Sequence, residues 1–362
     1  MIELSSLVLF FIPKSILWLC FIVVAFLIVY CSKQISKYVA GISEKSKLGG
    51  AFLGAFVLSL VTSIPELISG ITSSLIGNPI QSFGNVIGVN MMTLTVLCML
   101  DIIYVKKALF SKVSNTNRKT IIYVFGFNVL FLLCIFIPKL NDFLTINIGI
   151  TKFSLVFLFM IVFYMVFIYR VYKLGGEEND EDAESSGCEQ LSLKQVVIRF
   201  FIFSIILIGL SVLIASITDQ MGMPSDEGGY GFGKAAAGLL FLSICTGLPE
   251  ITTAFSLARL GQGNIALGGI IGSHLFNFLV FFFGDIFFAS SGTVQNLYTN
   301  EAELLTLRIS VIVGMALNML LFANTFKKNV KNKFVYILPC VIIIALYFVF
   351  WFTKDSLIAF FS

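Results

Sequence analysis

The chain has 362 residues, of which 58% are hydrophobic and only 12% charged, and its net charge is +4. Soluble domains are roughly 45–50% apolar and about 25% charged, so composition excludes a mainly soluble fold. The basic residues lie in short loops and not in one patch with interleaved aromatics, which argues against nucleic acid as a partner.

Ten apolar segments are each long enough to cross a bilayer as a helix, which takes about 20 residues. They lie at roughly residues 12–31, 50–76, 84–105, 120–138, 151–172, 195–217, 234–260, 266–290, 304–324 and 334–353. The sequence therefore predicts an all-α polytopic membrane protein with ten transmembrane helices. The first segment has no obvious small-residue cleavage site and is expected to be a retained span.

The positions of Lys and Arg predict the orientation, because short basic loops stay on the cytoplasmic side. The loops after the first, third and ninth segments are basic, whereas those at 77–83, 218–233 and 291–303 contain neither Lys nor Arg. The two kinds of loop alternate. We therefore expect an integral membrane protein with both termini on the non-cytoplasmic side.

An acidic stretch divides the chain into a first repeat, 1–174, and a second repeat, 194–362. Its acidic residues are Glu177, Glu178, Asp180, Glu181, Asp182, Glu184 and Glu189. Such a composition cannot form a core, so 175–193 is predicted to be a solvated cytoplasmic linker. A hinge is favoured over a regulatory calcium-binding segment, because the ligand spacing and central Gly of an EF-hand are absent.

The cysteines indicate neither a disulfide framework nor a zinc site. Five of the seven lie inside apolar segments, where a thiol behaves as a small hydrophobe: Cys20, Cys98, Cys134, Cys245 and Cys340. No CxxC pattern is present. We expect no cofactor.

The two halves carry an internal repeat at a gapless offset of 184 residues. Residues 62–66, Thr-Ser-Ile-Pro-Glu, match residues 246–250, Thr-Gly-Leu-Pro-Glu, and the glycine-rich stretch 84–90 matches 268–274. Because each half contains five spans, an odd number, the second half enters the membrane upside down. The sequence predicts two inverted five-helix repeats, an arrangement found in many secondary transporters with sites near the midplane.

Glu66 and Glu250 each fall in the middle of a long apolar span. An intramembrane carboxylate costs a few kcal/mol even on the lowest scales, so it normally faces a cavity and binds or relays something. At matched positions of inverted repeats the two could converge, with a charge that suits one divalent cation, or monovalent cations or protons. The alternative, two protonated packing residues, is disfavoured.

Neighbouring features extend this hypothesis. Pro65 and Pro249 disrupt backbone bonding one turn earlier, at Val61 and Cys245, and free carbonyls at membrane depth need partners. Hydroxyl residues recur every three or four positions beside each glutamate, and hard cations prefer such oxygens. They are Ser59, Thr62, Ser63, Ser69 and Ser73 in the first half and Ser243, Thr246 and Thr253 in the second.

The next span of each half carries small and polar residues. Gly84, Gly88, Gly268, Gly269 and Gly272 are expected to let another helix approach closely. Thr93, Ser273 and Asn277 are the polar candidates there. His274, the single histidine, is either a proton relay or, as we favour, a hydrogen-bonded packing residue. Asp101 and Asp285 lie near span ends, where solvation or helix–loop bonding explains them as well as ion binding does.

In these motifs the chain resembles the cation/calcium exchanger superfamily, the sodium/calcium exchanger membrane region with paired alpha repeats. That family has G-T-S-x-P-E on one helix of each repeat and G-N-x-x-G-S-N-x-F-N/D on the next. The resemblance covers all ten spans in layout and about forty residues of motif in each half.

The resemblance implies that Glu66 and Glu250 ligate calcium. It implies further oxygen ligands for sodium or calcium from Thr62, Ser63 and Thr246, and it matches Ser273 and Asn277 to polar positions of the second repeat. This chain departs from the pattern at three positions, Val89, Thr93 and Gly247. These departures remove candidate sodium ligands and leave the counter-ion open, and Asn277 in place of Asp makes potassium co-transport less expected.

The sequence thus favours a secondary active antiporter that exchanges calcium for sodium or protons by alternating access at a midplane site, with the bilayer and small cations as its partners. By analogy, spans one and six are the expected gating elements. One rival is a gated cation channel with the carboxylates lining a pore. Another is a non-transporting membrane sensor or scaffold. An intramembrane enzyme is not expected, because no GxSxG, HExxH or paired catalytic Asp motif occurs in the spans.

Overall fold

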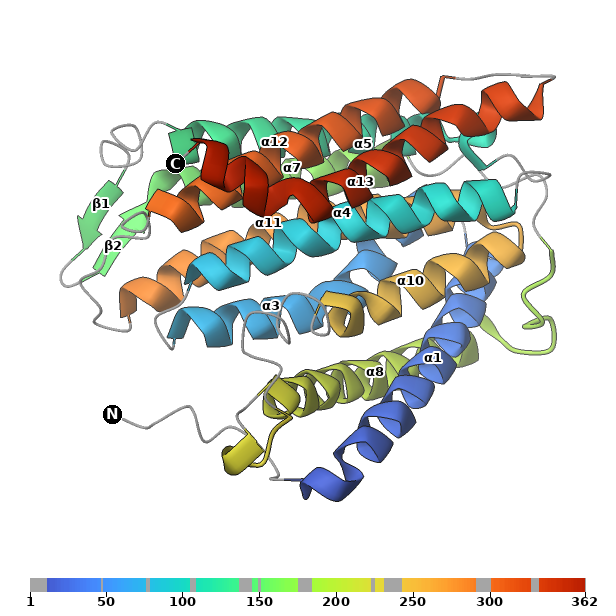
Figure 1. The fold of residues 1–362 in the computed structure, drawn as a ribbon. Coiled ribbons are helices and arrows are strands. Elements are labelled where there is room, and N and C mark those ends of the chain that lie inside the picture. Colours follow the sequence, from blue (N-terminus) through green and yellow to red (C-terminus); the bar gives the residue numbers. More distant parts are fainter. Residues whose placement is uncertain are drawn as a thin grey trace.

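The computed structural model describes residues 12–46, 48–75, 79–104, 109–136, 145–148, 151–174, 184–222, 225–230, 243–290, 301–326 and 332–361. Within these ranges the chain forms ten long helical segments and one short hairpin (Figure 1). Those of the first half are α1 (Lys14–Lys45), the continuous run of α2 (Gly50–Phe52), η2 (Leu53–Leu58) and α3 (Ser59–Leu75), then α4 (Pro79–Ile103), α5 (Asn115–Phe136) and α7 (Leu155–Leu174). Those of the second half are α8 (Leu193–Gly222), α10 (Ser243–Arg259), α11 (Gly263–Ser290), α12 (Glu301–Asn324) and α13 (Lys333–Phe361).

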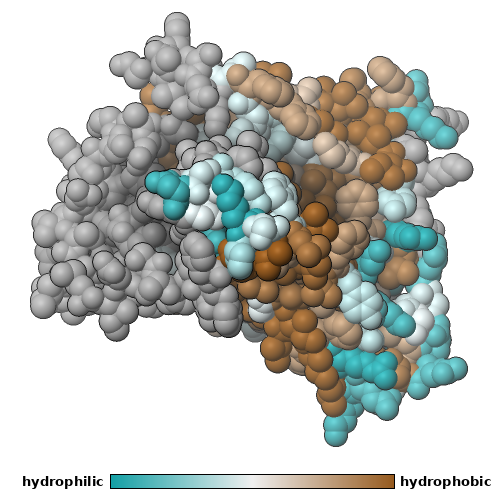
Figure 2. All heavy atoms as spheres, turned by 60° about the horizontal axis from the view of Figure 1, so that its bottom comes forward, coloured by the Kyte–Doolittle hydropathy of each residue, from teal (hydrophilic) through white to brown (hydrophobic). Residues whose placement is uncertain are grey.

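Seven of the described helical segments are long and apolar enough to cross a membrane: α1, α2 to α3, α4, α8, α11, α12 and α13. Large apolar side chains are exposed along α1 and α8, among them Leu19, Phe26, Phe201 and Ile205. Figure 2 shows a broad apolar area on the described part of this face, with hydrophilic residues at its right-hand rim. Lipid, not water, is the solvent that such a surface suits.

The two halves run in opposite directions, as the odd number of spans predicted. In Figure 1, α3 runs from right to left and its counterpart α10 from left to right, and the same reversal relates α4 to α11. Matched side chains on these helices therefore approach the centre of the molecule from opposite sides. The all-α fold with two inverted five-helix repeats is confirmed.

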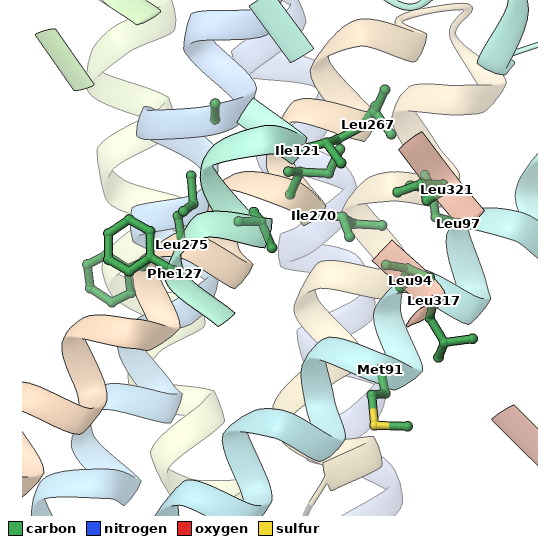
Figure 3. Close-up of a cluster of buried hydrophobic side chains, with 14 of the residues drawn as sticks. Met91, Leu94, Leu97, Ile121, Phe127, Leu267, Ile270, Leu275, Leu317 and Leu321 are labelled. Carbon is green, nitrogen blue, oxygen red and sulfur yellow. The ribbon is translucent and has the colours of Figure 1, made fainter. Parts of the chain in front are cut away.

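The core has two hydrophobic clusters. The larger joins α4, α5, α7, α11, α12 and α13, and Figure 3 shows part of it, including Leu94, Phe127 and Leu275. The smaller joins α1 and α8 to one side of η2, α3, α10 and α11. The pair α1 and α8 thus forms a layer of its own against the rest of the bundle.

α11 is the most deeply buried candidate span of the described part of the chain. Its glycines explain how it reaches the centre: a Cβ at Gly268 would lie 3.0 Å from the Ala51 carbonyl oxygen, and a Cβ at Gly272 would overlap the backbone of Ala55. The close approach predicted for Gly268, Gly269 and Gly272 is confirmed. No described residue lies within 4 Å of a Cβ at Gly84 or Gly88. In the repeat, the segment that corresponds to η2 is within residues 231–242, which lie outside the described residues, so the prediction for these two glycines is not tested.

The π-helical turn η2 was not predicted. It covers Leu53–Leu58, directly before α3, and lies against α11 where Gly54 faces the backbone of Ile265 and Gly269. π-Turns inside helices occur frequently at functional sites. Here the turn sets the rotation of α3 as it approaches the centre, which no apolar periodicity indicates.

Several boundaries differ from the sequence prediction. α1 extends to Lys45, well past residue 31, because Ser32, Ser36 and Ser43 are buried against neighbouring helices and do not end the span. The segment predicted to begin at 151 starts instead with a strand: β1 (Thr145–Ile148) pairs antiparallel with β2 (Thr151–Ser154) before α7 begins. Thr151–Ser154 adjoins the apolar run that forms α7, and periodicity does not separate so short a strand from the first turn of a helix.

The last part of the acidic linker packs onto the bundle. Residues 175–183 lie outside the described part, but Ser186 donates from its backbone N and its Oγ to the Glu44 carboxylate at 2.7 and 2.5 Å. Cys188 is fully buried against Gly41 of α1, and the Glu184 N–H donates to the Leu260 carbonyl at 2.9 Å. This segment therefore ties the end of α1 to the turn between α10 and α11.

Candidate cation-binding site

Two carboxylates meet in the centre of the bundle. Glu66 on α3 and Glu250 on α10 are 1% and 2% exposed, and they lie close enough for their charges to repel each other. A hydrogen bond also links the two helices. Ser63 Oγ, on the same helix as Glu66, donates to Glu250 Oε1 at 2.9 Å. The helices that carry the two carboxylates therefore converge on one buried place.

Hydroxyl groups from both halves surround the pair. The Thr246 hydroxyl lies next to the Glu66 carboxylate, without the geometry of a full hydrogen bond to it. The Ser273 hydroxyl, which donates to the Ile270 carbonyl at 2.8 Å, lies beside Glu250. With Ser63, the structure thus places three of the predicted hydroxyl residues beside the carboxylates.

The other predicted residues lie further from the pair or are engaged elsewhere. Thr62 Oγ1 is buried and donates back to its own helix, at the carbonyls of Leu58 and Ser59. Thr93 Oγ1 pairs with His274 Nε2 at 2.9 Å, and Asn277 Nδ2 donates to Asn90 Oδ1 at 2.8 Å. These last two contacts clamp α4 to α11 beside the site.

Many oxygens of the cluster have no partner. Both oxygens of Glu66, Oε2 of Glu250, Oγ1 of Thr246 and Oδ1 of Asn277 are buried without a hydrogen bond to any residue that the structure describes. An unpartnered buried polar atom costs about 1–3 kcal/mol, and more if it is charged. Two carboxylates with hydroxyl and amide oxygens are the donor set that hard cations such as calcium and sodium prefer.

His274 is buried, with Nε2 bound to Thr93 and Nδ1 without a partner. Its counterpart Asn90 makes an equivalent contact with Asn277. Because His274 and Asn90 make matched hydrogen bonds in the two halves, the contact of His274 fits the favoured interpretation of this histidine as a hydrogen-bonded packing residue.

Asp101 lies outside the site. It is fully buried at the end of α4, where Oδ1 accepts from Tyr336 of α13 at 2.6 Å and from the Phe110 N–H at 3.3 Å. Phe110 belongs to η3 (Leu109–Lys112), the loop that follows α4. Of the explanations considered, helix–loop bonding is confirmed and solvation at the interface is wrong. The side chain of Asp285 lies outside the described residues.

Pro65 and Pro249 both lie inside helices, which continue through them as α3 and α10. The site is therefore formed by proline-containing helices and not by chain breaks. Where the structure describes the chain, no three His, Cys, Asp or Glu side chains converge as a metal centre, so the two carboxylates are the acidic groups of this site.

The chain matches known proteins along most of its length. A family model described as sodium/calcium exchanger protein matches residues 16–173 and 196–354. Inner membrane protein YrbG of Escherichia coli is 23% identical over 237 residues, which are 63% of this chain and 66%, just under two thirds, of that protein. Sodium/calcium exchanger MaX1 of Methanosarcina acetivorans is 30% identical over 96 residues, 26% of this chain and 25% of that protein.

A solved structure has the same fold. The sodium-calcium exchanger NCX_Mj, soaked with 10 mM Na⁺ and zero Ca²⁺, superimposes with a TM-score of 0.67 at 17% sequence identity, over 93% of this chain and 98% of that one. The same exchanger has also been solved after soaking with strontium, with a TM-score of 0.66 and 19% identity.

Proposed function

Because this chain belongs to the sodium/calcium exchanger family, a family of membrane antiporters and not of enzymes, we propose that it exchanges calcium for sodium or protons by alternating access to the site between Glu66 and Glu250. Cation exchange across a membrane follows from the family. The identity of the ions, the residues that bind them and the mechanism are the proposal.

The observation that carries the proposal is the set of buried carboxylate oxygens without partners. Two adjacent carboxylates that repel each other, with no basic residue bonded to them, are stabilised by a bound cation or by protons. When such a site is empty and both carboxylates are ionised, their desolvation and mutual repulsion make that state energetically unfavourable. The antiporter therefore exchanges one occupant for another instead of returning empty, which is the requirement for coupled exchange.

The residues have distinct roles in this proposal. Glu66 and Glu250 supply the charge, and Ser63, Thr246 and Ser273 supply hydroxyl oxygens from the positions described above. Thr62, Thr93 and Asn277 complete the set of candidate ligands, of which Asn277 has a free amide oxygen and the two threonines hold helix backbones in place.

The layered core suggests how access alternates. α1 and α8 share one hydrophobic cluster and contact the central helices through a side of α3 and α10, with one side-chain bond from Ser36 Oγ to the Thr253 carbonyl at 3.3 Å. Among the described residues, sliding of this layer over the carboxylate-bearing helices would break this bond, and the linker contacts at Glu44 and Leu260 would hold the end of α1 as a hinge. Such a movement would expose the site first to one side of the bilayer and then to the other.

The test is a flux assay on the purified protein in liposomes. Calcium uptake is measured with an outward gradient of sodium, of potassium or of protons. We expect uptake with sodium or protons to saturate with calcium concentration and to need the counter-gradient, whereas a channel would pass calcium without one.

Glu66→Gln and Glu250→Gln should each reduce the flux to background, because each removes a charge from the site. Asp226→Asn, which changes an exposed carboxylate of η4 (Ser225–Glu227), is the matched control and should retain wild-type flux. Wild-type rates in either glutamine variant would refute the proposal. Calcium binding without any flux would favour a sensor.

A further inference from the structure

The repeat gives each contact between the halves a counterpart, in which both residues are replaced by those 184 positions away. The Asn277–Asn90 bond of 2.8 Å has as its counterpart the Thr93–His274 bond of 2.9 Å. Both are present, although the residue types differ. The side chains around the site therefore obey the two-fold relation between the halves.

The Ser63–Glu250 contact has no such counterpart. The counterpart of the Ser63–Glu250 bond joins Glu66 to position 247, where the residue is Gly247 and no hydroxyl exists. The counterpart of Ser273, which lies beside Glu250, is Val89. Glu250 thus has two hydroxyl neighbours without a counterpart beside Glu66, and both Glu66 oxygens have no hydrogen-bond partner among the described residues.

A side chain from α4 fills the place of the missing hydroxyl. A Cβ at Gly247 would lie 2.6 Å from Cε of Met92 and 3.9 Å from Cγ1 of Val89. Methionine is unbranched and flexible and suits irregular gaps of this kind. Its methyl group offers no ligand to a hard cation, which requires oxygen.

We propose that Met92 closes one half of the site, so that a single cation is held off-centre beside Glu250 and no second cation binds beside Glu66. The inference rests on the proposed function of the carboxylate pair as the transport site. It identifies the substrate state as one divalent cation, or one monovalent cation with a proton on the second carboxylate, at a time. A second monovalent ion would need an oxygen shell of its own, and beside Glu66 the Thr246 hydroxyl is the one neighbour described above.

The test measures how sodium competes with calcium for the purified protein in detergent. Calcium binding is titrated calorimetrically at increasing sodium concentration. If one sodium ion displaces one calcium ion, the logarithm of the apparent calcium Kd rises with the logarithm of sodium concentration with a slope of about one. A wild-type slope of about two or more would overturn the proposal.

Two variants reopen the closed half by independent routes. Gly247→Ser combined with Met92→Ala adds a hydroxyl and removes the methyl group that obstructs it, and Val89→Ser adds a hydroxyl without needing new space. Each should steepen the slope toward two and tighten sodium binding roughly fivefold, the effect of one contact worth about 1 kcal/mol. Gly247→Ser alone adds the hydroxyl where the Met92 methyl group obstructs it, and should leave the slope at the wild-type value.

Gly209→Ser is the matched control, because it adds the same side chain on α8, where no described residue lies within 4 Å. It should leave both slope and affinity unchanged. If both reopening variants bind calcium but keep the wild-type slope, Met92 has no such role. The liposome assay distinguishes failure of the proposed function from failure of this inference. If the wild-type protein shows no flux, the proposed function is refuted; if flux is normal but the reopening variants keep the wild-type slope, only the closure by Met92 is refuted.

Discussion

At the scale of single residues, the centre of this protein is a collection of oxygens without enough donors. Glu66, Glu250 and Thr246 contribute four buried oxygens without a hydrogen-bond partner among the described residues. Ser63, on the first half, bonds directly to the Glu250 carboxylate of the second. Its hydroxyl both fixes the Glu250 carboxylate and offers an oxygen lone pair to a bound ion.

Ser63→Ala should therefore raise the calcium concentration for half-maximal flux roughly fivefold, the effect of losing one hydrogen bond worth about 1 kcal/mol. The measurement is calcium uptake by liposomes at varied calcium concentration. Ser59→Ala is the control: this hydroxyl lies on the same helix but donates to its own backbone at Ala55 and Phe56. An equal effect of both variants would contradict a role of Ser63 in binding.

At the scale of elements, the site depends on how closely α11 approaches η2. The backbone of Ala55 occupies the space that a side chain at position 272 would need. Because backbone cannot move aside as a flexible side chain can, this contact fixes α11, and with it Ser273 and Asn277, relative to the start of α3.

Gly272→Ala should separate α11 from η2, destabilise the protein by about 1–3 kcal/mol or more, and abolish flux. Thermal unfolding in detergent and the liposome assay measure the two effects. Gly126→Ala on α5, with no described residue within 4 Å, is the matched control and should be neutral or slightly stabilising, since alanine favours helix by up to about 1 kcal/mol over glycine. If Gly272→Ala unfolded at the wild-type temperature, the close contact with Ala55 would not contribute to stability as we expect.

At the scale of the whole molecule, the helices that precede the basic loops end on the same side of the bundle as the described part of the linker. In Figure 1 the last turns of α1, α4 and α12 lie at the right-hand end, together with residues 184–192. Ser225 lies at the other end, where its Oγ accepts from Lys14 Nζ at 3.2 Å at the start of α1. The sequence predicts that the basic end is cytoplasmic.

In a cysteine-free background, Ser225→Cys should react with a membrane-impermeant maleimide added to intact cells, and Gln190→Cys should react only after permeabilisation. Both positions are exposed, so accessibility within the protein does not separate them. The reverse labelling pattern would place both termini in the cytoplasm and invert the predicted orientation, without affecting the fold.

The sequence by itself determined the helical membrane architecture and the inverted repeat, and it predicted the carboxylates of the candidate site, because apolar length, chain parity and buried charge are properties of residue type and order. The tertiary structure alone decided the π-turn η2, the docking of the linker at Glu44, the pairing of Thr93 with His274 and the position of Met92 against Gly247. Each of these depends on which side chain fills space left by a residue far away in the chain. These contacts are determined by packing between segments distant in the chain, so no local sequence pattern predicts them.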